Sequence, residues 1–187
     1  MEIMSQARQR LSDDHHVVGE VLEQLLTALA NKDVQTSHFK LDLLWARLAV
    51  HIRAEHLHLF PAVISRLTES PDHVVPDLSE AQVIVENLRA DHDFFMRELA
   101  RAIGIFRELP RTITRAVDEM KLAAVGDIVR EIEKRLASHN ELEENQIYRW
   151  SSTILTEPEQ LELLARINAE LENPPRRFSE EAWANRL

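Results

Sequence analysis

The chain has 187 residues, with 32 acidic residues against 22 Lys and Arg, a formal net charge of −10 and no cysteine. The acidic balance argues against nonspecific nucleic-acid binding and against anionic membrane surfaces, because both reward Lys and Arg. The lack of cysteine excludes disulfides, thiolate metal sites and cysteine nucleophiles. The start of the chain has no secretory signal and no apolar run approaches membrane-spanning length, so we expect a cytoplasmic protein.

The apolar periodicity predicts two long helices in the first half of the chain. The first runs from about residue 7 to 30 and the second from about 33 to 67, with apolar residues three and four apart. The stretch TESPDHVVPDLSE then breaks the pattern with Pro71 and Pro76. Only three glycines and 5% aromatic residues are present, which also favours helices over sheets.

The second half predicts two further long helices. A capping box over residues 79–82 precedes a third helix at about 80–109, which Pro110 ends or kinks. A fourth helix follows at about 112–155, and Gly126 inside it weakens the prediction of an unbroken helix.

A shorter helix is expected after the four long ones. Residues 156–159 read as another capping box, and the helix that follows reaches about Leu171 before a tail, NPPRRFSEEAWANRL. The expected fold is all-α: an antiparallel up-down four-helix bundle with an additional C-terminal helix and tail. We place the bundle at residues 1–155, with 156–187 packed on it or extending from it.

Histidines and glutamates recur on the apolar faces of the four long helices. Each helix carries a histidine in phase with its apolar stripe, and the second and fourth carry a glutamate four residues later on the same face. The candidate metal ligands are His15, His51, Glu55, His92, His139 and Glu143. Four imidazoles and two carboxylates suit two first-row transition-metal ions, although the ligand types alone admit iron, manganese and zinc. The charge of the ions would offset the burial of the carboxylates.

The two halves of the chain carry the same pattern. DHHVVGEVLEQLL followed by HIRAE matches DHDFFMRELARAI followed by HNELE, so that H…HxxxE…H…HxxxE lies on four helices. This pattern resembles the hemerythrin-like HHE cation-binding domains over roughly residues 8–154, with HIRAEHLHLFP similar to that family's HxxxEExxLFP and HNELEENQIY to its HxxxEE. The resemblance implies a non-haem centre of two iron ions with an oxo or hydroxo bridge, an exchangeable position and those six residues as ligands.

The sequence departs from the oxygen carriers of that family at two places. Their third-helix HxxxH has Met96 at its second histidine here, and their fourth-helix HxxxxD places Glu144 as an alternative carboxylate to Glu143. We prefer Glu143, because it repeats the spacing of Glu55. These departures argue against reversible oxygen carriage.

One further histidine is in phase with the candidate ligands. His58 lies three residues after Glu55, so that regular α-helical geometry puts it on the face of His51. It is either an extra ligand or a partner of a bound water or carboxylate. The histidines expected to lie outside the centre are His16, His38, His56 and His73.

Several functions are compatible with such a centre. The protein either binds or senses O₂, NO or peroxide, passing a signal to a protein partner or within a homo-oligomer, or it is an enzyme that reduces NO or peroxide or oxidises iron. A third alternative is an iron store or donor for the repair of iron centres, and the last is a bundle without metal. We expect a protein that binds or senses such a ligand, with the enzyme and the iron store or donor as alternatives.

Overall fold

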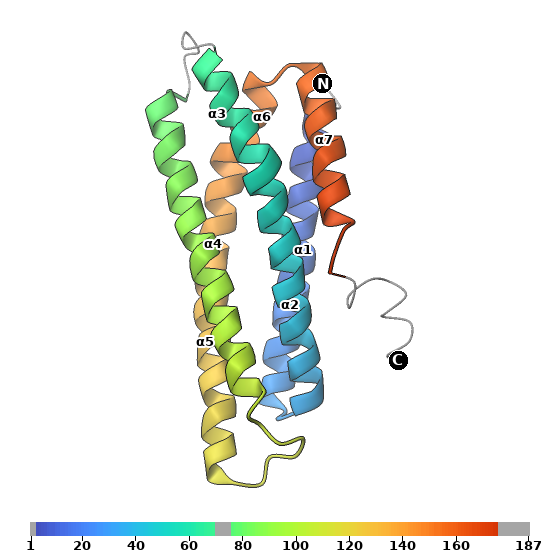
Figure 1. Ribbon diagram of the computed structural model, residues 1–187, viewed down its shortest axis with the longest axis vertical. Coiled ribbons are helices and arrows are strands. Elements are labelled where there is room, and N and C mark those ends of the chain that lie inside the picture. Colours follow the sequence, from blue (N-terminus) through green and yellow to red (C-terminus); the bar gives the residue numbers. More distant parts are fainter. Residues whose placement is uncertain (1–2, 70–75, 176–187) are drawn as a thin grey trace.

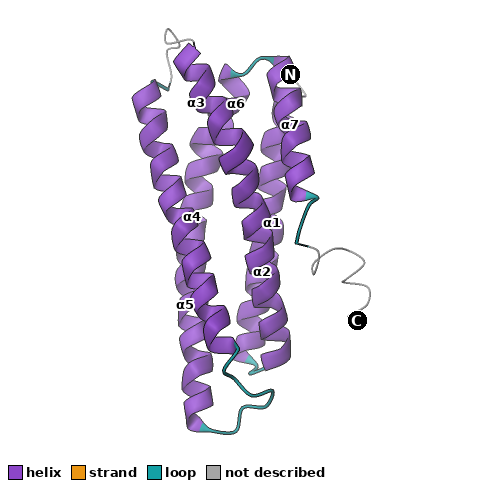
Figure 2. Cartoon of the chain, in the orientation of Figure 1, coloured by secondary structure: helices purple, strands orange, loops and turns teal. Residues whose placement is uncertain are grey.

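The computed structural model describes residues 3–69 and 76–175, with side chains from residue 6 onward. All regular elements in this part of the chain are helices, and no strand occurs there (Figure 2). The prediction of an all-helical protein is therefore confirmed. No helix within the described ranges combines the length and apolar character needed to cross a membrane.

The first half forms two long rods. Helix α1 (Ile3–Ala30) is followed by α2 (Val34–Ala54), whose N-terminus is capped by the Asp33 carboxylate accepting the Thr36 N–H at 3.0 Å. Helix α2 continues without a break through the π-helical turn η1 (Glu55–Leu59) into α3 (Phe60–Glu69). The predicted break at Pro71 lies outside the described residues.

The second half begins with α4 (Leu78–Phe106), and its start differs from the prediction. The Asp77 carboxylate caps α4 by accepting the Glu80 N–H at 2.7 Å, so the expected capping box over residues 79–82 is wrong. Asp77 takes the cap because its backbone is still extended, whereas residue 79 is already helical. Helix α4 ends at Phe106, before Pro110.

The remaining helices follow the expected order. Helix α5 (Ala116–Leu142) starts later than residue 112, because Arg115 is still extended with φ −111° and ψ 145°. It passes Gly126 unbroken and continues through a second π-helical turn, η2 (Glu143–Ile147), into α6 (Tyr148–Ile154). Helix α7 (Glu157–Leu171) starts with the predicted Thr156–Glu159 capping box, which is confirmed.

The long helices lie side by side along the long axis of the molecule (Figure 1). Helix α1 packs on α2 and α5, α4 packs on α2 and α5, and the four therefore enclose a common interior. Helix α7 packs against α1, α2 and η1. One π-helical turn follows α2 and the other follows α5, and both begin at a candidate ligand glutamate.

The apolar interior is divided into two clusters. One includes Leu25, Leu44 and Phe106, and the other includes Leu11 and Phe60. The polar candidate ligands lie along the helices at the junction between them. Burying polar groups here costs free energy unless they pair with each other or with an ion.

Candidate metal centre

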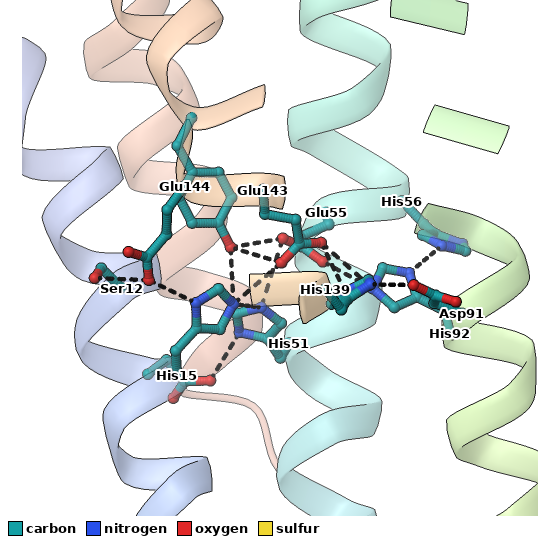
Figure 3. Close-up of polar contacts among 12 residues, drawn as sticks. Ser12, His15, His51, Glu55, His56, Asp91, His92, His139, Glu143 and Glu144 are labelled. Atoms are coloured by element: carbon teal, nitrogen blue, oxygen red, sulfur yellow. Dashed lines mark hydrogen bonds and ion pairs between the residues drawn. The ribbon is translucent and has the colours of Figure 1, made fainter. Parts of the chain in front are cut away.

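Six predicted side chains converge at the junction between the apolar clusters. All are buried, with exposed fractions between 0% and 8%. Their ligand atoms form two groups that could each hold a metal ion and that share Glu143: His15, His51, Glu55 and Glu143, and His92, His139 and Glu143. Figure 3 shows the two glutamates between a first pair of histidines, His15 and His51, and a second pair, His92 and His139. The grouping agrees with the predicted set, while metal ligation itself stays a prediction.

Glu55 faces both histidine pairs. Its Oε1 lies 3.5 Å from Nε2 of His51, and its Oε2 lies 3.3 Å from Nε2 of His92. Within the described part of the chain, Oε2 is buried without a hydrogen-bond partner. A buried carboxylate oxygen left in this way is costly, and a cation between the pairs would remove that cost.

Glu143 repeats the arrangement from the opposite side. Its Oε2 lies 3.2 Å from Nε2 of His15, and its Oε1 lies 3.0 Å from Nε2 of His139. Each glutamate therefore presents one oxygen to each pair, which is the arrangement of a carboxylate that bridges two ions.

The outward nitrogens of His51 and His139 hydrogen-bond to aspartate side chains. Nδ1 of His51 lies 3.0 Å from Oδ2 of Asp14, and Nδ1 of His139 lies 3.1 Å from Oδ2 of Asp91. Each aspartate directly precedes a candidate ligand histidine in sequence but pairs with the histidine of the next helix. A carboxylate on Nδ1 fixes the tautomer and ring orientation and makes Nε2 a better electron donor.

The Nε2 atoms of His15 and His51 lie too close together for both to keep an unshared lone pair. Nδ1 of His15 faces Oε1 of Glu144 at 3.1 Å, and Nδ1 of His51 faces Asp14, so both Nδ1 atoms carry the proton in the neutral tautomer. Both Nε2 lone pairs then point inward, and the two Nε2 atoms are 3.1 Å apart. A proton or a metal ion between them resolves the repulsion.

The charges of the metal-free centre compensate one another. Burial lowers the pKa of His51, but Glu55 and Asp14 outweigh it and raise this pKa well above its ordinary value. His139 has a raised pKa for the same reason, with Glu143 as the main opposing charge. Burial raises the pKa of Glu143, yet the histidines around it hold it well below the usual range. Protonated imidazoles thus take the place of cations when no metal is bound.

Both π-helical turns begin at one of the two candidate ligand glutamates. The Phe60 N–H bonds to the Glu55 carbonyl, and the Tyr148 N–H bonds to the Glu143 carbonyl, in i→i+5 hydrogen bonds. Single π turns of this kind occur frequently at functional sites. Each π turn contains one more residue than an α-helical turn. The side chains from this turn onward therefore point in other directions than regular α-helical spacing predicts.

Because of this extra residue, two histidines do not point in the directions that regular α-helical spacing predicts. His56 was expected to point away, but its Nε2 lies 2.9 Å from Nδ1 of His92 and it supports the second pair. His58 was expected to face the metals, but it turns toward α7, where its Nε2 lies 3.6 Å from Oε1 of Glu170. It lines a surface hollow with Arg66 and belongs to neither candidate metal group found in the described chain.

The remaining histidines and the alternative carboxylate are also placed. His16 and His38 are exposed, as expected, and His73 lies outside the described residues. Glu144 points outward to His15 and Ser12, while Glu143 points inward.

The sequence interpretation missed Tyr148. This tyrosine is completely buried, and its hydroxyl donates to Oε1 of Glu55 at 2.8 Å. Burial, together with the charges of Glu143 and Glu55, raises the pKa of the Tyr148 phenol well above its ordinary value. One pattern could have revealed it: an aromatic residue, Phe60 or Tyr148, stands five residues after each candidate ligand glutamate.

Fold and site together define an all-helical protein with buried His/Glu groups that could hold metal. Comparison with protein-family models, with curated proteins and with solved structures gives no significant match.

Proposed function

We propose that this chain is a hemerythrin-like non-haem di-iron protein that binds or senses O₂, NO or peroxide. The observation that carries the proposal is the position of the two glutamates, each with one oxygen toward each histidine pair. Two iron ions, bridged by oxo or hydroxo as the family resemblance implies, would supply the redox chemistry and the exchangeable coordination position. The four histidines and two glutamates of the chain would hold them.

The spacing of the histidines supports ions with near right-angle ligand geometry. Two nitrogens each about 2.1 Å from one ion lie about 3.0 Å apart at a right angle and about 3.4 Å apart at the tetrahedral angle. The Nε2 atoms are 3.1 Å apart in the first pair and 2.9 Å apart in the second. Each pair is therefore close enough for both of its Nε2 atoms to bind one ion, which supports a metal ion at each pair.

The size of the adjoining cavity supports a small ligand. A cavity with about 10 Å³ of space for the centre of a water-sized molecule touches all four histidines. Its other walls are apolar except for Asn140, whose Oδ1 is buried without a hydrogen-bond partner in the described structure. On this measure the space is about that of one water molecule, so it supports only a very small ligand over a larger organic substrate, and Asn140 would orient what binds there.

The packing of the long helices supports the finer architecture. We propose that residues 1–155 form the antiparallel four-helix bundle that holds the metals, and that α7 is an additional helix packed on it. The contacts of α1 with α2 and α5, and of α4 with the same two helices, are those of such a bundle.

The test is iron loading followed by exposure to small ligands. Protein reconstituted anaerobically with Fe(II) should hold two irons per chain, and NO should change its visible and paramagnetic resonance spectra stoichiometrically. Catalytic consumption of NO or peroxide would instead assign an enzyme. The absence of bound iron, or a strict preference for zinc, would contradict the proposal. Protein carrying His51→Ala together with His139→Ala is the control for adventitious metal.

A further inference from the structure

The aromatic residues that follow the two glutamates differ by one hydroxyl group. Phe60 and Tyr148 each stand five residues after a bridging glutamate, each begins the α-helix after a π turn, and both side chains are completely buried. The Phe60 ring stacks on His92 of the second pair, with ring centres 6.1 Å apart. The Tyr148 ring stacks on His15 of the first pair, with ring centres 5.6 Å apart. The repeated framework therefore carries a hydroxyl at the first pair and a bare ring at the second.

The Tyr148 hydroxyl lies among the candidate ligand atoms of the first pair. Its oxygen is 2.8 Å from Oε1 of Glu55, 3.1 Å from Nε2 of His15 and 3.4 Å from Oε2 of Glu143. These separations are close to the distance of about 3.0 Å between neighbouring ligand atoms of a metal ion with right-angle geometry. The phenol oxygen thus occupies a position that a ligand of this ion would occupy.

One hydroxyl proton does not satisfy all of these contacts. The proton is directed to Glu55, because that hydrogen bond is the shortest. Nε2 of His15 offers a lone pair, since its Nδ1 proton faces Glu144. The phenol oxygen, this nitrogen and the Glu143 carboxylate are then buried electron-pair donors around one point, and a cation at that point would satisfy them all.

We propose that Tyr148 is a fifth protein ligand to the metal ion of the first pair. The inference rests on the proposed metal centre and adds a ligand to it. On binding, the phenol O–H bond breaks, its proton passes to solvent and the oxygen forms a bond to the ion, with no change in the oxidation state of either partner. The ion of the second pair faces Phe60, receives no such ligand and keeps one more position for a small molecule. The two ions are consequently inequivalent.

The test uses the visible and resonance Raman spectra of protein loaded with iron and oxidised to Fe(III). Phenolate bound to Fe(III) gives a visible charge-transfer band and tyrosine ring vibrations enhanced by excitation into that band. The chain contains one tyrosine and no cysteine, so such a band has a single source among its side chains. Wild-type protein should show the band, and Tyr148→Phe should lose it completely while iron remains at the His92 and His139 pair.

A matched variant moves the hydroxyl to the other half. Phe60→Tyr combined with Tyr148→Phe should restore a tyrosinate band, because the new hydroxyl then faces the second pair. Circular dichroism of each metal-free variant checks that the fold is retained. Wild-type protein with two irons but without tyrosinate vibrations would overturn the ligand assignment and leave the di-iron proposal standing, as would an unchanged band in Tyr148→Phe. Wild-type protein that binds no iron would overturn both.

Discussion

The two halves of the centre use the same framework and differ around it. Each half has a histidine pair, a candidate ligand glutamate at the start of a π turn, and an aspartate on Nδ1 of one histidine. The position directly after the glutamate is His56 in one half and Glu144 in the other, and each of these side chains supports a histidine across the interior. The first pair thus gains an additional carboxylate and the second pair an imidazole.

The repeated and the unrepeated residues would therefore have different roles in metal binding. In the proposed centre, holding two ions would need the repeated residues, because each ion would be bound by two histidines and by both carboxylates. Making the two ions unequal would need the residues that are not repeated. A carboxylate that accepts from the outward N–H makes a histidine a stronger electron donor to the metal than a neutral imidazole does. We therefore expect the ion of the first pair to be the more readily oxidised one.

The largest effect is expected at a bridging glutamate. Glu143→Ala should empty both halves, since its two oxygens face His15 in one pair and His139 in the other. Glu144→Ala is the matched control: it removes only a partner of His15, so it should lower affinity but keep two ions per chain at saturating metal, as measured by elemental analysis. Full metal in Glu143→Ala with an empty centre in Glu144→Ala would reverse the assignment of the carboxylate.

Single histidine variants should separate the halves. His51→Ala should remove the ion of the first pair, and His139→Ala that of the second, because each removes an inward Nε2 from one group only. Metal content should fall from two ions per chain to one in each variant. A content of two in either variant would show that the altered histidine is not a ligand.

The aspartates should contribute less, and unequally. Asp14→Asn and Asp91→Asn leave the ligands in place but weaken the support of His51 and His139, so each should reduce metal affinity by about 10–100-fold. The effect should be larger for Asp14, which is 1% exposed, than for Asp91, which is 20% exposed. Competition with a chromogenic chelator measures this, and an equal or reversed order would contradict the role assigned to burial.

Substitutions of the two histidines in η1 should have very different effects on metal affinity. His56→Ala should weaken metal binding by roughly 10-fold, at the low end for such a supporting contact, because it removes the partner of His92. His58→Ala should leave affinity and spectrum unchanged, since this side chain faces Glu170. The same chelator competition distinguishes the two, and a larger loss in His58→Ala would refute the placement of both residues.

The smallest effect concerns the metal-free protein at different pH. The raised pKa values of His51 and His139 contribute stability that is complete below the unfolded value of about 6.5 and is lost as pH rises through the folded values. The melting temperature in chelator should therefore fall on the alkaline side, more through His51, whose pKa is raised further. Bound metal replaces these protons, so the loaded protein should lack this decline. An alkaline slope that persists when His51→Ala is combined with His139→Ala would point to other groups.

Much of the site follows from helical spacing alone. HxxxE places both side chains on one face of a regular helix, and the histidine stripes of α1 and α4 face the same interior, so the six residues could be predicted without coordinates. The capping box at Thr156 was equally readable, whereas the start of α4 was not. Two local candidates, Asp77 and Ser79, compete there, and the observed cap depends on where the chain enters the helix.

The amino-acid sequence by itself determined that the protein is helical and which histidines and glutamates meet in its interior, because these follow from periodicities within single helices. Only the tertiary structure decided that His56 supports the centre, that His58 leaves it and that Tyr148 enters it. The physical reason is the π turn at each glutamate, because it changes the helical phase that the spacing of a regular α-helix predicts. The partners of Asp14 and Asp91 likewise lie on the next helix, and such pairings exist only once the helices are packed.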